Sequence, residues 1–189
     1  MTDPLASQLA DSLDDTFPDL VDVHGSMVLT LAIRLTDGST GEDIAQDAFL
    51  RAYRALASYD QTQITRLDLR PWLATITRNL VKNEYRRRDR RPHVELDQRT
   101  QLVAPVDEAI DIIDTRDEVN DMLAALPDDQ RDAVVLRHIL GLPIREVALT
   151  LSCPVGTAKS HVSRGLGRLR DTHGDEANRI AEPNGGEAT

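Results

Sequence analysis

Aromatic residues are scarce in this chain of 189 residues, since one Trp, three Tyr and two Phe make up only 3% of it. Any hydrophobic core must therefore consist mainly of Leu, Ile, Val and Ala, which dominate the 40% of residues that are hydrophobic. A chain of this length has room for one full domain or two small ones.

Cysteine is nearly absent as well. The single Cys153 excludes an intramolecular disulfide and is typical of a reducing compartment. The five His and one Cys show no metal-ligand spacing, and neither a Gly-rich phosphate loop nor a nucleophile elbow occurs. We therefore expect no metal, no cofactor and no catalytic site, so the chain is not expected to be an enzyme.

A long apolar run is also missing. The longest apolar stretch, MVLTLAIRL, is too short to cross a membrane and contains Arg34. The acidic N-terminus lacks the basic and apolar segments of a signal peptide. These absences predict a soluble, cytoplasmic protein that makes no contact with a membrane.

Positive charge is in deficit, because 32 acidic residues outweigh 22 Lys and Arg and give a formal net charge of −10. Such a charge alone would weaken binding to nucleic acid. The cations are concentrated, however: nine lie between residues 66 and 91 against three acids, and residues 154–170 hold four cations and no acid. Two basic segments in an acidic chain indicate local contacts with DNA.

Apolar residues recur at helical spacing, whereas the alternation typical of strands is nearly absent. We predict an all-α fold of two small helical domains joined by a flexible linker, the C-terminal one containing a helix-turn-helix. Helices are expected at about 17–35, 40–58, 71–88, 116–126, 127–140, 143–151 and 155–170, with a polar loop at 60–70. The expected boundaries are an acidic N-terminal tail at 1–14, a first domain at 15–91, a linker at 92–115, a second domain at 116–172 and a disordered tail at 173–189.

The strongest motif lies between Pro143 and Arg170, where a short helix, a tight turn and a longer helix follow one another. In a helix-turn-helix, the second helix lies in the major groove of DNA. An ordinary helical hairpin with a charged face is the alternative, but a face without carboxylates over seventeen residues is unusual for one. The apolar contact between the two helices is expected from Val147, Ala148, Leu151, Val155 and Val162. The DNA-binding residues expected on the second helix are Lys159, Ser160, Ser163, Arg164 and Arg168.

Two glycines interrupt this second helix. Gly165 and Gly167 each destabilise a helix by about 1 kcal/mol relative to Ala. We therefore expect its second half to fray without DNA.

A second DNA-binding surface is predicted on the helix that begins near Pro71. Its C-terminal part, EYRRRDRRPH, holds more cations than the dipole of a helix end requires, although a solvated helix end is the alternative. Two amides one turn apart can bind bases while the arginines bind phosphates. The expected residues are Asn79, Lys82, Asn83, Arg86, Arg87 and Arg88.

Three segments in this order resemble the extracytoplasmic-function (ECF) group of the sigma-70 family of bacterial sigma factors. GEDIAQDAFLRAYRALASYD is similar to the segment that docks on the clamp helices of RNA polymerase. RPWLATITRNLVKNEYRRRDRR resembles the part that melts and binds the minus-10 element, and LPDDQRDAVVLRHILGLPIREVALTLSCPVGTAKSHVSRGLGRLR resembles the region that binds the minus-35 element. Residues 15–91 would then be sigma region 2 and residues 116–172 sigma region 4. The chain departs from the family at Ala158, His161, Gly165 and Gly167, and in the turn LSCP, where a glycine is common.

The resemblance implies a factor that binds the beta and beta-prime subunits of core RNA polymerase, recognises both promoter elements and initiates transcription of a specific regulon. Asn79 and Asn83, with loop 60–70, would hold a flipped minus-10 base, and the linker would thread toward the RNA channel. An anti-sigma factor is a further possible partner. The residues implied in polymerase binding are Asp43, Gln46, Asp47, Leu50 and Arg51.

Two other functions remain open at this point. A helix-turn-helix regulator acting alone would explain residues 116–170, but it would give the first domain no role. A sigma-like decoy that binds only an anti-sigma protein would fit the acidic charge, but it would not need the two basic segments.

Overall fold

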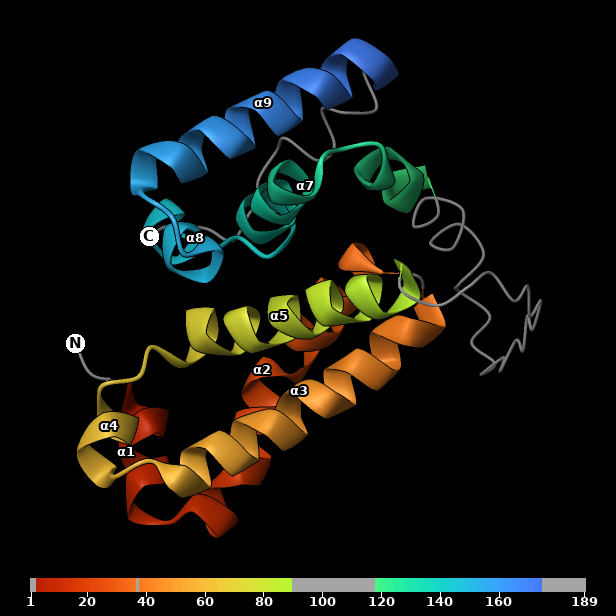
Figure 1. Ribbon diagram of the computed structural model, residues 1–189. Coiled ribbons are helices and arrows are strands. Elements are labelled where there is room, and N and C mark those ends of the chain that lie inside the picture. Colours follow the sequence, from red (N-terminus) through yellow and green to blue (C-terminus); the bar gives the residue numbers. More distant parts are fainter. Residues whose placement is uncertain (1–2, 37, 90–117, 175–189) are drawn as a thin grey trace, which may run out of the picture.

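The computed structural model describes residues 3–36, 38–89 and 118–174, and all regular elements in these ranges are helices (Figure 1). The all-α prediction is thereby confirmed, while the linker predicted at 92–115 lies outside the described residues. The elements are α1 (Pro4–Asp11), α2 (Leu13–Leu35), α3 (Gly38–Ser58), α4 (Gln61–Thr65), α5 (Leu69–Asp89), α7 (Asp128–Val134), the π-helical η1 (Val135–Ile139), α8 (Ile144–Leu151) and α9 (Val155–His173). Residues 118–124 form a further helical segment before α7.

The first domain is a bundle of α2, α3 and α5, the three helices expected from the apolar spacing. A Cβ atom at Gly41 would lie 2.8 Å from the Cα of Ile33, so glycine permits the close approach of α3 to α2. The core is aliphatic, as the shortage of aromatic residues predicts. It includes Leu20, Leu31 and Leu35 of α2, Ala48 and Leu56 of α3, and Leu73 of α5.

The prediction of an acidic tail at residues 1–14 was wrong, because these residues contain α1. The carboxylate of Asp3 accepts a hydrogen bond from the Leu5 amide at 3.0 Å and caps the helix. Ala6 and Leu9 are buried, and α1 packs on α2 and α4. A helix of only two turns has too few apolar residues to display a period, so the pattern did not reveal it.

The expected loop at 60–70 also contains a short helix, α4. Asp60 and Gln63 cap it reciprocally: the Gln63 amide donates to the Asp60 carboxylate at 2.8 Å, and the Asp60 amide donates to Oε1 of Gln63 at 2.9 Å. The helix α5 then begins at Leu69 rather than at Pro71. The connection from α3 to α5 therefore contains a short helix and is not only a polar loop.

In the second domain, α7 and α8 pack against α9 to complete the helix-turn-helix. Ala148 and Ala158 are buried at this packing, whereas Val155, which was expected to take part, is 40% exposed. Val155 lines a hollow with Ala148 and Leu149 of α8, at the edge of this packing. Ser152 in the turn adopts a left-handed conformation (φ 53°), which L residues rarely adopt and glycine adopts readily.

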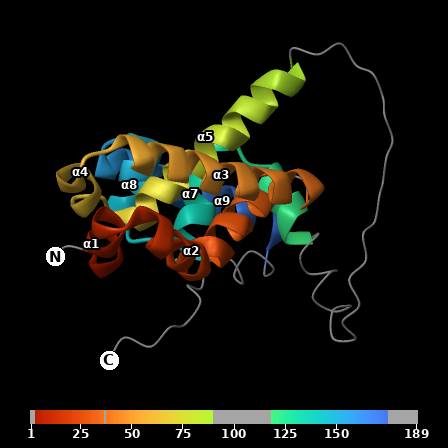
Figure 2. The same cartoon turned by 90° about the horizontal axis from the view of Figure 1, so that it is seen from below.

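The two domains pack together along α5, with α8 lying on it and α9 on the far side of α8 (Figure 1). The C-terminal end of α5 extends beyond the rest of the molecule (Figure 2). Arg70 donates a hydrogen bond to the Leu140 carbonyl at 2.6 Å, and Arg34 donates one to Asn120 at 2.8 Å. Buried apolar residues form one cluster that includes both domains.

Glu146 of α8 lies at this domain interface, close to Asp68 and Arg70. Burial raises the pKa of the Glu146 carboxyl and the charge of Asp68 raises it further, while Arg70 acts in the opposite direction. Among the described residues, its Oε2 atom has no hydrogen-bond partner. The ionised side chain therefore opposes the packing of α8 on the first domain.

We expect Glu146→Gln to raise the free energy of unfolding at neutral pH but not in acid. A carboxyl whose pKa is raised on folding destabilises the folded state once the pH exceeds its unfolded pKa of 4.5, because its ionised form is disfavoured in the interface. The difference between the variant and the wild type should therefore be small near pH 4 and grow toward about pH 7, as measured by urea denaturation at each pH. The exposed Glu42→Gln serves as a control. A gain of equal size at both pH values would contradict this account.

Gly165 and Gly167 both lie within α9, which continues through them to His173, and they differ in their surroundings. A Cβ at 165 would lie 2.6 Å from Cγ2 of Val134, whereas a Cβ at 167 would meet nothing within 4 Å. We expect Gly167→Ala to stabilise the protein by about 1 kcal/mol. Gly165→Ala should destabilise it, because α7 and α9 would have to move apart. Urea denaturation of the two variants measures both effects, and equal effects would refute the proposed contact.

Candidate nucleic-acid and polymerase surfaces

Of the residues predicted to bind the minus-10 element, the two amides and Arg86 lie on one face of α5. Asn79 and Asn83 are exposed, as is Arg86 at the end that extends from the molecule (Figure 2). Because residues four apart lie on one helix face, the two amides can contact neighbouring groups of one ligand.

Two of the arginines at this end form ion pairs with a carboxylate of the same helix. Glu84 lies 3.0 Å from Arg87 and 3.4 Å from Arg88, and Arg88 also donates a hydrogen bond to Oγ1 of Thr40 at 2.7 Å. Exposed pairs of this kind contribute about 0–1 kcal/mol. The arginines can therefore exchange Glu84 for a phosphate at little cost.

Lys82 has a different environment, because it faces the second domain. Its Nζ atom lies 3.4 Å from Oδ1 of Asp129 in α7. Arg78, one turn earlier, binds the same Oδ1 atom at 3.1 Å through Nη2 and Oδ2 of Asp132 at 2.5 Å through Nε. Arg78 and Asp132 are 7% and 4% exposed, so this is a buried ion pair between the domains.

Burial also affects the ionisation of this pair. It raises the pKa of the Asp132 carboxyl, and the charge and hydrogen bond of Arg78 only partly oppose it. Sequence reasoning missed Arg78 as a residue of this site. Its spacing of four from Lys82 was a signal, but its partner lies 54 positions later in the chain.

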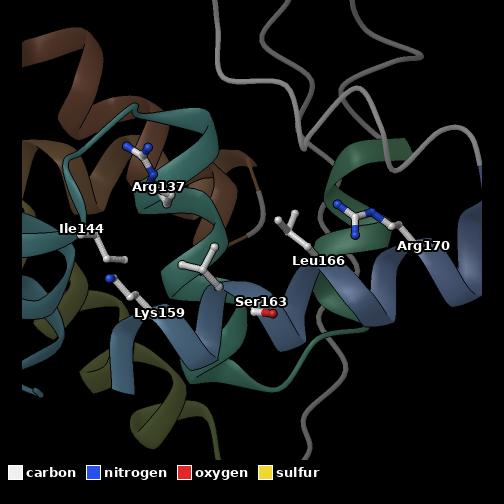
Figure 3. Close-up of a pocket in the computed structure, with 7 residues that line it drawn as sticks. Arg137, Ile144, Lys159, Ser163, Leu166 and Arg170 are labelled. Atoms are coloured by element: carbon white, nitrogen blue, oxygen red, sulfur yellow. The ribbon is translucent and has the colours of Figure 1, made fainter. Parts of the chain in front are cut away.

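The residues predicted to bind the minus-35 element are all exposed, but they lie on two sides of α9. Lys159 and Ser163 line a groove of about 430 Å³ (Figure 3). Its other lining residues are Arg137, Ile144, Val162, Leu166 and Arg170. Ser160, Arg164 and Arg168 lie outside this groove, on the neighbouring face of the helix. The structure thus separates a groove with an apolar wall from an open polar face.

The residues implied in polymerase binding share the outward face of α3. All five are exposed, and their spacing of three and four places them opposite the buried Ile44, Ala48 and Ala52. Leu50 is 48% exposed, which makes it an apolar contact point within a charged surface. These residues are Asp43, Gln46, Asp47, Leu50 and Arg51.

Other kinds of site find no support in the residues that the structure describes. Within 3–36, 38–89 and 118–174, no group of three or more His, Cys, Asp or Glu side chains could hold a metal ion. None of the helices described is long and apolar enough to span a membrane. Cys153 is half-buried in the turn before α9.

Both domains match known sequence families. The family model described as Sigma-70 region 2 matches residues 20–91, and the one described as Sigma-70, region 4 matches residues 116–169. The chain is 31% identical over 170 residues to the ECF RNA polymerase sigma factor SigW of Bacillus subtilis, which covers 82% of this chain and 88% of SigW. It is 33% identical over 135 residues to the ECF RNA polymerase sigma factor SigC of Mycobacterium tuberculosis, with 71% of each chain covered.

Solved structures show the same fold. CnrH in complex with the cytosolic domain of CnrY is similar with a TM-score of 0.67 and 24% identity, over 88% of this chain and 93% of that one. The sigma factor RpoE from Bartonella quintana, in complex with the anti-sigma factor NepR, gives a TM-score of 0.62 and 25% identity, over 82% and 94%. With two matched regions in order and relatives aligned over most of its length, the chain belongs to the sigma-70 family and is an ECF sigma factor, a non-enzymatic factor that initiates transcription by RNA polymerase.

Proposed function

We propose that this sigma factor recognises promoters through two separate surfaces, α5 for the minus-10 element and α9 for the minus-35 element, and thereby directs transcription of a specific regulon. The observation that carries the proposal is the exposure of the two amides of α5 and of Arg86, Arg87 and Arg88, in a helix whose C-terminal end projects from the molecule (Figure 2). A solvated helix end requires only one or two cations. The remaining cations are suited to the phosphates of a DNA strand.

At the minus-10 element, α5 would capture a base that has left the stack. Unstacking a base costs a few kcal/mol, which the many contacts of the assembled polymerase can supply. Asn79 and Asn83 would bind the edge of that base, and the segment 60–70 with α4 would form the other side of its pocket. Arg86, Arg87 and Arg88 would bind the strand on either side.

At the minus-35 element, the polar face of α9 would enter the major groove. Arg164 and Arg168 can bind guanine edges or phosphates, and Ser160 suits either. Lys159 and Ser163, at the edge of the groove in Figure 3, would contact the same duplex from the other side of the helix. The contacts of both sides together would set the sequence preference.

The partners follow from the family. The exposed face of α3 would dock on core RNA polymerase, with contacts to the beta and beta-prime subunits. The protein would therefore act in the cytoplasm, together with polymerase and promoter DNA. Because two similar structures, CnrH and RpoE, were solved with CnrY and with the anti-sigma factor NepR, an anti-sigma factor is a further expected partner.

Run-off transcription with the purified protein, core RNA polymerase and sheared DNA of the source organism tests this function. Discrete start sites that share two upstream motifs are the expected result. Absence of specific starts together with binding to duplex DNA by the protein alone would instead indicate a helix-turn-helix regulator. Absence of both activities would indicate a decoy.

We expect variants of α5 to separate base contacts from phosphate contacts. Asn79→Ala and Asn83→Ala should reduce promoter opening without changing its dependence on salt, because an amide releases no counterion. Arg86→Ala and Arg87→Ala should each lower the slope of log affinity against log salt by about 0.7 to 0.9. Binding of the reconstituted holoenzyme to a promoter fragment, measured over a series of salt concentrations, checks both. Equal slopes for all four variants would argue against phosphate contacts.

On α9, we expect Arg164→Ala and Arg168→Ala to weaken transcription from promoters with an intact minus-35 element. Loss of a base contact costs about 1–3 kcal/mol, which corresponds to about 5- to 150-fold in binding. The control is the same promoter with a scrambled minus-35 element, on which variants and wild type should perform alike. A similar loss on both promoters would show that these arginines bind elsewhere.

A further inference from the structure

Arg78 and Lys82 form a site with two cations on the side of α5 that faces the second domain. They lie four residues apart and so project from one face. Both approach a single atom, Oδ1 of Asp129, at 3.1 and 3.4 Å. The Asp129 side chain is itself 57% exposed, so this atom lies at the edge of the interface.

Two cations that converge on one oxyanion constitute a site that also suits phosphate. Arginine binds carboxylate and phosphate with the same donor geometry, and lysine adds a point charge. The exposed residues of α5 that are expected to meet the DNA strand, Asn79 and Asn83, follow Arg78 and Lys82 by one position each. A strand bound to these amides would therefore pass beside the two cations.

The closed arrangement is incompatible with simultaneous binding of both promoter elements. Packed helices lie 8–10 Å apart, so α5 and α9, which both contact α8, are separated by about 20 Å or less. The minus-10 and minus-35 elements lie about 25 base pairs apart, or about 85 Å at 3.4 Å per base pair. The two domains must therefore separate, and the 28 residues from 90 to 117 can span about 90 Å when extended.

We propose that Arg78 and Lys82 bind a backbone phosphate of promoter DNA, and that Asp129 occupies this site while the two domains are packed together. The proposal rests on the proposed function, because it assumes that α5 meets DNA. It adds Arg78 to the DNA-binding residues and gives the acidic start of α7 a role as a competitor of DNA. Asp132 holds Arg78 in the closed arrangement, and separation of the domains leaves that guanidinium without its buried partner. A phosphate then replaces the lost carboxylates.

The experiment compares full-length variants for shape and for DNA binding. Asp129→Asn with Asp132→Asn removes the competing carboxylates, and Asp121→Asn with Asp128→Asn removes two charges from the same domain without touching Arg78 or Lys82. Small-angle X-ray scattering gives the radius of gyration. Fluorescence anisotropy with a labelled single-stranded oligonucleotide of mixed sequence gives the affinity over a series of salt concentrations.

We expect the first double variant to have a larger radius of gyration than the control and to bind the oligonucleotide about tenfold more tightly, because apparent affinity scales with the open fraction. Addition of Arg78→Ala should reverse the gain in affinity and lower the salt slope by about 0.7, and Arg78→Lys should preserve the slope. The single variant Asp129→Asn changes an exposed side chain and should fold normally. It should also raise the radius of gyration and the affinity, so the test does not depend on the folding of the double variant.

Two results would overturn the proposal. Unchanged shape and affinity in both Asp129 variants would show that Asp129 does not compete with DNA. An opened molecule whose affinity and salt slope are indifferent to Arg78→Ala would show that the arginine is structural only. Either result is distinguishable from failure of the proposed function, because the wild type with core polymerase would still produce discrete transcription starts.

Discussion

The buried ion pair between Arg78 and Asp132 is the interaction on which the arrangement of the two domains depends. Removal of two charges from water costs several kcal/mol per ion, and their attraction offsets this cost only when the pair is well aligned. Loss of one partner would leave an uncompensated buried charge, which costs about 3–5 kcal/mol. The pair therefore selects one relative orientation of the domains rather than adding much stability. Lys82 and Asp129 extend it to the surface.

This arrangement also explains how an acidic protein can carry DNA-binding surfaces. Acidic and basic residues are segregated in this chain, whose net charge is −10. Asp129 and Asp132 at the start of α7 form ion pairs with the cations of α5. Part of the positive charge is thus neutralised within the free molecule, while the polar face of α9 remains exposed. If the closed state binds DNA weakly, as we propose, a sigma factor of this kind would not occupy DNA without polymerase.

The sequence sufficed to predict the long helices, because α2, α3 and α5 each repeat their apolar residues over several turns. It did not reveal α1, which is too short to show a period, although the reciprocal caps of Asp60 and Gln63 were a usable signal for α4. The exposure of most candidate site residues followed from their spacing, whereas their roles rest on family resemblance and stay predictions. The ion pairs that join α7 to α5 could not be predicted, because Arg78 and Asp132 are 54 residues apart and no local pattern links them.

The π-helical segment η1 has a consequence for how the chain can vary in length. Here the Leu140 amide binds the Val135 carbonyl at 3.0 Å, five residues back, which means that the turn contains one residue more than an α-helical turn. Removal of that residue would rotate α7 relative to α8 by about 100°. Asp129 and Asp132 would then point away from α5, and Val134 would leave its contact with Gly165 of α9. A relative with a one-residue deletion between Val134 and Ile144 would therefore have to repack α7 against both α5 and α9, so the length of this turn is a sequence marker for the closed arrangement.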